Sequence, residues 1–420
     1  MKLLIYSHSY APSVGGVETI VLSLARGLSE LHDSSGGNEF DITVVTKTPS
    51  NDPDEAAPSF RVIRQPGLMR LFQLLRECDV LHVAGPAIAP LALNVVARKP
   101  VVIEHHGYQS VCPNGLLIQQ TDKSVCPGHF QAGNYRKCAT CLEKNSSKIQ
   151  SWAKLLLMFP RCFLANHASA NLAVSNYSLR RCALPRSTLI YHGIAEPVAQ
   201  TSHDCSERDA SQGTCFAYVG RLVSEKGVST LLEAAGILRD EGHRFEVRII
   251  GDGPELSKLR EKIIHERLES TFKLTGFLTG EAFAQSMWDV QVVIMPSVWE
   301  ETAGLAAMEQ MMRGRLVIAS NIGGLGEVVG DAGMKCEPAD PAGLADAMRK
   351  VLLQPTLIDS YGHLARKRAK ELFALDRMIE EHAQVYRAVS MGPSWSSGAS
   401  SDLSQMTGSP CVTSKVNTRP

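Results

Sequence analysis

PSVWEETAGLAAMEQMMRGRLVIASNIGGLGEVV, residues 296–329, is the stretch that decides the fold. The apolar run VQVVIM at 290–295 comes directly before it and is typical of a buried strand. Residues 303–313 are strong helix formers without a proline, and a glycine follows them. The apolar run at 316–319 predicts a second strand, which we expect to open into a glycine loop at 323–327. Strand, helix and strand in this order predict a βαβ unit of a parallel sheet.

Glu301 and Glu309 are the candidate ligand-binding acids of this unit. Parallel sheets bind ligands beyond the carboxyl ends of their strands, where Glu301 lies. Glu309 follows about two helical turns later, and so stays on the same side of the helix. The start of that helix directs unpaired N–H groups at the same place, which suits a phosphate, while carboxylates accept hydrogen bonds from sugar hydroxyls. A nucleotide-sugar pocket explains both features; the alternative is two solvated acids on an exposed helix.

The stretch resembles the donor-site signature of the family-four glycosyltransferases, and the resemblance extends over residues 1–387. Members of that family are retaining enzymes of the GT-B fold. The resemblance therefore implies an α/β protein with two Rossmann-like domains whose parallel sheets face each other across a cleft. It implies a nucleotide-diphosphate sugar as donor and no cofactor for catalysis. By this resemblance Glu301 contacts the donor sugar and has a catalytic role, Glu309 contacts the ribose, and Gly304 and Leu305 belong to the donor site.

Arg221 and Lys226 lie in the sequence GRLVSEKG at 220–227, between a predicted strand and a predicted helix. Two fixed cations at this point can hold a diphosphate and neutralise it as it leaves. A pair of cations alone is nonspecific. The whole sequence, however, resembles the diphosphate motif of the same family. The resemblance makes Arg221 and Lys226 the pyrophosphate ligands, with a catalytic role in stabilising the leaving group.

The N-terminal half opens with a strand, a Gly-Gly turn and a helix. The apolar run at 2–7 predicts the strand, Gly15 and Gly16 form the turn, and 19–31 has the spacing of a helix. The G-x-G-x-x-G fingerprint is missing, which disfavours a dehydrogenase. Paired glycines allow close approach of the backbone to a ligand. The resemblance implies that this turn faces the cleft and helps to hold donor phosphate and acceptor; the alternative is a plain tight turn.

His106 is the candidate catalytic histidine. The apolar run at 100–104 predicts a strand that leads into His105, His106 and Gly107. The phrase HGYQSVCP resembles a segment of the family that aligns His106 with an active-site histidine contacting the donor sugar. His105 is the alternative if this register is wrong by one residue. The family often has Asp where this chain has Gly107, so any acceptor role of that Asp is absent or supplied elsewhere. The family also often has Asn where this chain has His192.

Four of the eleven cysteines lie within thirty residues, with the spacing C-x13-C-x11-C-x2-C. Without an export signal, so many cysteines favour reduced thiols or a metal over disulfides. A subset of the family carries a similar insertion beside the cleft, here at about 108–148. The set predicts a structural zinc site, with free or redox-active thiols as the alternative; no catalytic metal is implied. Its ligands would be Cys112, Cys126, Cys138 and Cys141.

Composition excludes several classes of protein. The formal net charge is zero, so no basic field for nucleic acid is present. No apolar run approaches the roughly 20 residues of a membrane span, and the N-terminus does not read as a signal peptide, so we expect a cytoplasmic protein. The basic and apolar segment 144–164 predicts an amphipathic helix packed on the sheet. The alternative is peripheral contact with a membrane, expected if the acceptor is lipid-linked. Asp52 and Asp54 match a D-x-D pattern in what reads as a solvated loop.

The chain is long enough for two or three domains. We expect an acceptor-side domain at 1–195, a linker at 196–213, a nucleotide-sugar-binding domain at 214–375, a helix crossing back at 376–390, and a disordered tail at 391–420.

The predicted function is transfer of a sugar, with retention, to a hydroxyl of a glycan, a lipid-linked glycan or a small molecule in polysaccharide or glycoconjugate biosynthesis. One alternative is a GT-B nucleotide-sugar epimerase or hydrolase. Another is a non-enzymatic, metal-containing binding protein.

Overall fold

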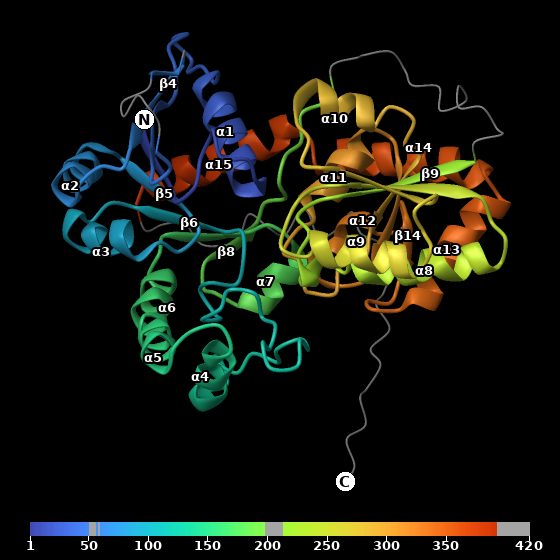
Figure 1. Ribbon diagram of the computed structural model, residues 1–420. Helices are drawn as coiled ribbons and strands as arrows, with labels where there is room; N and C mark the ends of the chain where they lie inside the picture. The colour runs from blue at the N-terminus through green and yellow to red at the C-terminus, as the bar shows by residue number, and fades with distance from the viewer. Residues whose placement is uncertain (50–55, 58, 198–212, 393–420) are drawn as a thin grey trace, which may run out of the picture.

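The computed structural model describes residues 1–49, 56–57, 59–197 and 213–392, and it shows two α/β lobes side by side (Figure 1). The predicted linker and the predicted tail lie largely outside these residues, and the D-x-D sequence at 52–54 lies wholly outside them.

The first lobe is built on an eight-stranded sheet in the order β3-β4-β2-β1-β5-β6-β7-β8, parallel except for the two-residue β3. Val, Ile and Leu fill most of its central strands, which are buried on both faces as parallel sheets require. The strands are β1 (Lys2–Ser7), β2 (Asp41–Thr46), β3 (Ala56–Ala57), β4 (Phe60–Arg64), β5 (Val80–Ala84), β6 (Val101–His105), β7 (Ala170–Ala173) and β8 (Ser187–Leu189).

Helices cover both faces of this first sheet. One face carries α1 together with α15, the last helix of the chain, and the other carries α2, α3 and the end of α6. The cysteine-bearing segment and α4 project below the sheet (Figure 1). The helices are α1 (Gly16–Ser29), α2 (Leu68–Glu77), α3 (Ile88–Ala97), α4 (Tyr135–Glu143), α5 (Lys148–Leu156), α6 (Met158–Asn166) and α7 (Asn176–Cys182).

The second lobe has a six-stranded parallel sheet in the order β11-β10-β9-β12-β13-β14. The central strands β9, β12 and β13 are fully buried along most of their length. The strands are β9 (Thr214–Val219), β10 (Phe245–Ile250), β11 (Phe272–Gly276), β12 (Val292–Met295), β13 (Leu316–Ser320) and β14 (Met334–Cys336).

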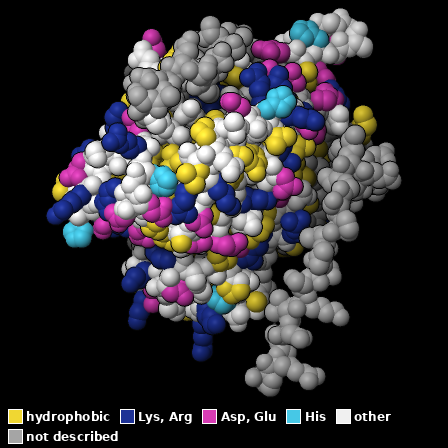
Figure 2. Space-filling view, turned by 90° about the vertical axis from the view of Figure 1, so that its right-hand side faces the viewer, with side chains coloured by type: hydrophobic (Ala, Val, Ile, Leu, Met, Phe, Trp, Pro, Cys, Tyr) yellow, Lys and Arg dark blue, Asp and Glu magenta, His cyan; other side chains and the backbone are white. Residues whose placement is uncertain are grey.

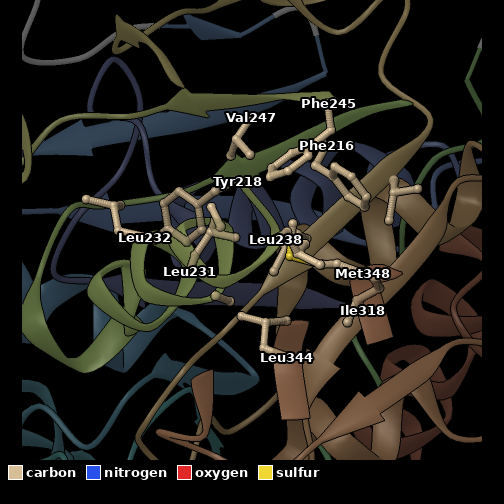
Figure 3. Close-up of a cluster of buried hydrophobic side chains, with 14 of the residues drawn as sticks. Phe216, Tyr218, Leu231, Leu232, Leu238, Phe245, Val247, Ile318, Leu344 and Met348 are labelled. Carbon is tan, nitrogen blue, oxygen red and sulfur yellow. The ribbon is translucent and has the colours of Figure 1, made fainter. Parts of the chain in front are cut away.

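Helices α8, α9 and α13 cover one face of the second sheet, where Phe216, Tyr218, Leu231 and Leu344 belong to one apolar cluster (Figure 3). Helices α11, α12 and α14 cover the other face. The bounds are α8 (Val228–Asp240), α9 (Leu256–His265), α10 (Gly280–Ser286), α11 (Leu305–Met312), α12 (Gly323–Val329), α13 (Pro341–Leu353) and α14 (Thr356–Leu372).

The chain passes between the lobes at two places that lie side by side. Helix α15 (Leu375–Ser390) leaves the second lobe and packs beside α1 of the first (Figure 1). Just before it, the carbonyl of Phe373 accepts a hydrogen bond from the N–H of Ile194 at 2.7 Å. Gly193 makes this approach possible, because a Cβ there would lie 2.8 Å from Leu375 Cα. The two crossings are therefore joined backbone to backbone.

The βαβ unit predicted from the organising stretch is confirmed as β12, α11 and β13. The glycine loop predicted at 323–327 is wrong, because these residues form α12. The glycines serve close packing instead, since a Cβ on Gly324 would lie 2.1 Å from the Thr302 carbonyl oxygen. The single amphipathic helix predicted at 144–164 is two helices, α5 and α6.

Charged side chains of both signs are interspersed on the outer face of the second lobe (Figure 2), as the zero net charge leads one to expect. Among the described residues, no helix combines the length and apolar character needed to cross a bilayer.

Candidate functional site

Lys226 and Glu301 meet at the carboxyl edge of the second sheet. Lys226 Nζ lies 2.8 Å from Glu301 Oε1, and both side chains are largely buried. Ser297, from the segment after β12, donates a hydrogen bond to the same carboxylate. Two residues that were predicted to share a site are therefore in direct contact, although 75 positions separate them in the sequence. The carboxylate is fixed in place by a cation and a hydroxyl.

Arg221 follows β9 and lies exposed beside this pair. The hydroxyl of Tyr218 donates a hydrogen bond to the carbonyl oxygen of Arg221 at 2.8 Å, which fixes the turn. The turn closes at Gly227, with φ +65°, where a Cβ would lie 2.0 Å from the carbonyl oxygen of Pro296. Only glycine permits this conformation and this approach together. The cation-bearing turn is thus pressed against the segment that carries Glu301.

The N-terminus of α11 faces the first lobe. Gly304 precedes the helix with φ +84°, in the left-handed region that favours glycine. The next side chain, Leu305, reaches across the lobe boundary, because a Cβ on Gly16 would lie 3.3 Å from Leu305 Cδ2. Gly15 precedes α1 in the same turn. The glycine turn of the first lobe and the helix start of the second therefore lie on opposite sides of one boundary.

Glu309 lies on α11 and is partly buried. Burial raises the pKa of its carboxyl, and nearby Arg313 opposes that rise. In the part of the chain that the structure describes, the carboxylate has no hydrogen bond or ion pair of its own. The structure gives no direct contact from Glu309 to Glu301, Lys226 or Arg221, so it does not join all four predicted side chains in one hydrogen-bonded network.

Thr302 connects the two lobes beside this edge. Its hydroxyl donates to the carbonyl oxygen of His106 at 2.9 Å, and its own carbonyl accepts from the Ser175 hydroxyl at 2.5 Å. The backbone of the predicted catalytic histidine is therefore held by the loop that carries Glu301. Sequence reasoning missed this threonine, because nothing in its local pattern marks it as a contact between lobes.

Two further acids of the second lobe bind the first lobe. Glu300 accepts a hydrogen bond from the Tyr177 hydroxyl and pairs with Arg181 at 2.9 Å. Glu327 accepts from the backbone N–H of Asn176 at 2.8 Å. Glu300 and Glu301 are adjacent in the sequence, yet one braces the lobes and the other lies with the cations. The sequence alone did not separate these roles.

His105 and His106 have different surroundings. His105 is buried, with Nε2 2.8 Å from Asn171 Oδ1 and Nδ1 3.2 Å from the Ser110 hydroxyl. His106 lies at the lobe boundary, with Nε2 3.3 Å from Glu104 Oε2 and Nδ1 3.2 Å from His192 Nε2. Only the carbonyl of His106, which accepts from Thr302, has a described hydrogen bond to the second lobe, while its ring faces Glu104 and His192 within the first lobe.

Glu104 is fully buried, and four imidazole rings lie within 4 Å of its carboxylate oxygens. His82 and His106 lie 3.5 and 3.3 Å from its Oε2, and His192 and His382 lie 3.7 and 3.9 Å from its Oε1. Burial alone would raise the pKa of Glu104, but His106, His382 and His82 outweigh it and hold the pKa well below its ordinary value. Burial lowers the pKa of His192 to about 3. Sequence reasoning singled out His106 and noted His192, but it did not predict that they meet Glu104, His82 and His382 in one cluster.

The four predicted zinc cysteines line one cavity of about 20 Å³ in the first lobe. Burial raises the pKa of Cys138 to about 12, and the thiols of Cys112, Cys126 and Cys141 add to the rise. The N–H of Gln120 donates to Cys141 Sγ at 3.3 Å. No three of these thiols lie within 4.8 Å of one another among the described residues, so the structure surrounds a cavity with them but does not close a ligand set.

Comparison with known proteins finds one family and several relatives that are similar to this chain. The family Glycosyl transferases group 1 matches residues 205–369. The chain is 27% identical over 411 residues to the glycogen synthase of Mycobacterium tuberculosis (strain ATCC 25618 / H37Rv), covering 93% of this chain and 96% of that protein.

Two solved structures have the same fold over nearly the whole chain. HepE of Anabaena in complex with UDP and glucose has a TM-score of 0.67 at 18% identity, covering 92% of this chain and 100% of that one. Sucrose-phosphate synthase from Thermosynechococcus elongatus has a TM-score of 0.66 at 20% identity, covering 92% and 98%.

Proposed function

We propose that this chain, which has the GT-B fold and carries a group 1 glycosyl transferase domain, is a retaining glycosyltransferase that uses a nucleotide-diphosphate sugar. The observation that carries the proposal is the contact between Lys226 and Glu301 beside the exposed Arg221, at the carboxyl edge of the second sheet. At this edge, two segments far apart in the sequence bring together positive charge for phosphates and a carboxylate for hydroxyls. A sugar diphosphate needs both.

In this proposal the diphosphate is held by Arg221, Lys226 and the N–H groups at the start of α11, around Gly304 and Leu305. Glu301 accepts hydrogen bonds from the donor sugar. Glu309, whose carboxylate has no described partner, accepts them from the ribose diol. The raised pKa of Glu309 supports this role, because a partly desolvated carboxylate without a cation gains most from new donors.

In the proposed step, the bond from C1 of the donor sugar to the diphosphate oxygen breaks while the acceptor oxygen bonds to C1 from the same face. The acceptor proton passes to the departing diphosphate oxygen, and we assign no side chain as general base. Arg221, Lys226 and the α11 N-terminus stabilise the negative charge that develops on the diphosphate. Attack on the face that the leaving group departs from accounts for retention.

The first lobe supplies the acceptor side in this proposal. Gly15 and Gly16 bring backbone close to the start of α11, and the contact of Gly16 with Leu305 supports that placement. His106 contacts the donor sugar from the opposite wall. Its hydrogen bond from Thr302 supports the position, because it ties the histidine backbone to the loop of Glu301.

We extend the proposal to a glycan or lipid-linked acceptor and a cytoplasmic protein in peripheral contact with a membrane. Helices α5 and α6 support this contact, because five large apolar side chains there are 44% to 84% exposed next to Lys148 and Lys154. These side chains are Ile149, Trp152, Leu156, Phe159 and Phe163.

Sedimentation with vesicles containing anionic lipid tests the membrane contact. Phe163→Ser should weaken binding, whereas Phe277→Ser, at an equally exposed phenylalanine of the second lobe, should not. Equal binding of both variants and the unchanged protein would remove the membrane from the proposal.

We also propose that the cysteine-lined cavity holds a structural zinc ion. Four thiols around a space with room for about one small occupant, and an N–H donating to Cys141, support it. A Cys138→Ser and Cys141→Ser double variant should lose zinc and melt at lower temperature. Unchanged metal content in that variant would leave free thiols as the better description.

Thermal-shift measurements with UDP-, GDP- and ADP-sugars test the donor class. A donor at about 100 times its dissociation constant stabilises by about 2.7 kcal/mol. Transfer to added acceptors, with the anomeric product read by NMR, tests activity and retention. Rapid formation of an epimer or free sugar without an acceptor would favour an epimerase or hydrolase, and no response to any nucleotide sugar would overturn the assignment.

A further inference from the structure

We infer that Glu104, His106 and His192 bind a divalent transition-metal ion of the Zn²⁺ type inside the first lobe, with His82 and His382 next to it. Each of the three offers one ligand atom, and these atoms lie within 4.8 Å of one another. The site is separate from the cysteine-lined cavity, but it shares His106 with the proposed donor site, so the inference is tested at Glu104 and His192, which have no proposed contact with the donor.

Apart from the hydrogen bond between His106 and His192, the distances to the Glu104 oxygens are those of ligands around an ion and not of direct hydrogen bonds. Charge-assisted N–H···O bonds are about 2.7–2.9 Å long. The four imidazole nitrogens lie 3.3 to 3.9 Å from the Glu104 oxygens. Ligand atoms at about 2.0–2.1 Å from one tetrahedral zinc are about 3.3 Å apart. The spacing leaves room for an ion between the carboxylate and the rings.

The buried polar atoms of the cluster are not satisfied by protein. Both oxygens of Glu104 lack a geometrically sound hydrogen bond, as do ring nitrogens of all four histidines. Within residues 1–49, 59–197 and 213–392, every ion pair of Glu104 is with an imidazole, and none is with lysine or arginine. A buried carboxylate without a full cation is costly, and unsatisfied groups at one point indicate a missing ion or water.

Hydrogen bonds on the far side of two rings direct their Nε2 atoms at the carboxylate. His382 Nδ1 lies 2.8 Å from the carbonyl oxygen of Met378, which can only accept, so Nδ1 carries the hydrogen. In the neutral ring, Nε2 then presents a lone pair toward Glu104. The Tyr386 hydroxyl, which can donate or accept, lies 3.0 Å from His82 Nδ1 and fixes the orientation of that ring. Metal-binding histidines are oriented by such outer partners.

A lone pair that faces a carboxylate is repelled unless a cation lies between them. One proton would relieve one such contact, whereas a divalent ion relieves several at once and is bound by imidazole and carboxylate in its ordinary coordination. The ligands come from β6, the segments after β6 and β8, and, beside them, β5 and α15. A bound ion would therefore tie α15, the helix that follows the second lobe, to the centre of the first sheet.

Metal analysis of the purified full chain tests the inference. We use the Cys138→Ser and Cys141→Ser double variant as background, so that the cysteine-lined cavity does not contribute. After equilibration with Zn²⁺ and desalting, this protein should retain about one equivalent, and addition of Glu104→Gln or His192→Asn should remove it. His167→Asn, at an exposed histidine of the same lobe, is the matched control and should retain it.

Two further measurements apply if the cysteine background does not fold. X-ray absorption of the zinc-loaded natural chain should show nitrogen or oxygen neighbours at about 2.0–2.1 Å as well as sulfur at about 2.3 Å. Tyr386→Phe removes no ligand but should weaken Zn²⁺ binding by about 10- to 100-fold. Sulfur neighbours alone, or equal zinc content in the folded Glu104→Gln and His167→Asn variants, would overturn the inference.

Discussion

Glu104 in the first lobe is fully buried and Glu309 in the second is partly buried, and their carboxyl groups have opposite surroundings. Glu104 has four imidazoles around it, and they hold its pKa well below the ordinary value against the effect of burial. Glu309 has no described ion pair, and burial raises its pKa. The first carboxylate is thus ionised by partners that the chain itself supplies. The second is left without partners at the edge where the donor is proposed to bind.

We interpret Glu104 as a residue that stabilises the fold and Glu309 as a residue that is available to the donor substrate. A fully buried carboxylate that is enclosed by imidazoles of its own chain cannot reach a substrate. A carboxylate that is partly buried without hydrogen-bond partners lowers stability, and a ligand that donates hydrogen bonds to it would recover that loss. Substitutions at the two positions should therefore change different quantities, and the following experiments compare them in order of expected effect.

The largest effect is expected on activity at the open carboxylate and its neighbouring cation. Glu309→Ala and Lys226→Ala should each lower kcat/KM for transfer by about 100- to 1,000-fold, because charged contacts to the donor are lost. Circular dichroism should show a folded protein. Lys262→Ala, at a surface lysine paired with Glu233, is the matched control and should leave kcat/KM unchanged. Normal turnover in both site variants would refute their assignment.

The next effect is expected on stability at the enclosed carboxylate. Glu104→Gln should lower the free energy of unfolding of the zinc-loaded protein by about 3 kcal/mol, because the inferred cation between the carboxylate and the imidazoles loses its charged partner. Urea unfolding measures it, with Glu233→Gln at an exposed position as control. Glu309→Gln should not lower stability, since it removes a charge that burial disfavours. Equal losses at positions 104 and 309 would contradict the comparison.

The pH dependence of activity should report Glu309. Because burial raises its pKa above the ordinary 4.5, lowering the pH protonates it earlier than an exposed glutamate and removes acceptors from the ribose. The acid limb of kcat/KM should therefore lie above pH 4.5 and vanish in Glu309→Gln. The same protonation favours the folded state, so this group's contribution to stability rises as activity falls. If the acid limb of kcat/KM is the same in Glu309→Gln, another titrating group causes it.

The smallest effect is expected at the contact between the lobes. Thr302→Val removes the hydrogen bond to the His106 carbonyl, and it should lower stability by about 1 kcal/mol and activity by less than the charged substitutions. A thermal melt and steady-state kinetics measure both. Thr140→Val removes a hydroxyl bond within a helix of the first lobe and is the control. A larger activity loss in Thr302→Val than in Lys226→Ala would show that the hydrogen bond between the lobes matters more for activity than the charge of Lys226.

The GT-B fold implied by the family resemblance is confirmed. The strands of the organising stretch were predictable as well, because their signals are local. The apolar runs at 292–295 and 316–320 are buried strands whose length and flanking turns are read directly from the chain. The glycines at 323–326 were misread for a physical reason. Glycine usually breaks a helix, but here it allows α12 to pack against the backbone of Thr302. Tertiary contact outweighed local propensity.

The site was predictable only in part. Motif resemblance singled out Lys226 and Glu301, which the structure places in contact, while their roles stay predictions. The histidine cluster draws on positions 82, 104, 106, 192 and 382, which share no local pattern and meet only when the sheet and α15 assemble. Glu300 and Glu301 differ because of what lies opposite each in the first lobe. No local sequence signal contains that information.

The hydrogen bond from Ile194 to Phe373 has a mechanical consequence. The segment that leaves the first lobe at Ile194 and the segment that returns to it after Phe373 are hydrogen-bonded to each other. We therefore expect the lobes to rotate less freely than they would if a single flexible linker joined them. We expect the two lobes to separate mainly by a hinge rotation about this hydrogen bond, with little translation of one lobe past the other. The close packing of Gly193 on Leu375 would then limit how far the lobes can separate. The hydrogen bond between Thr302 and His106 would break when the lobes separate and form again when they close.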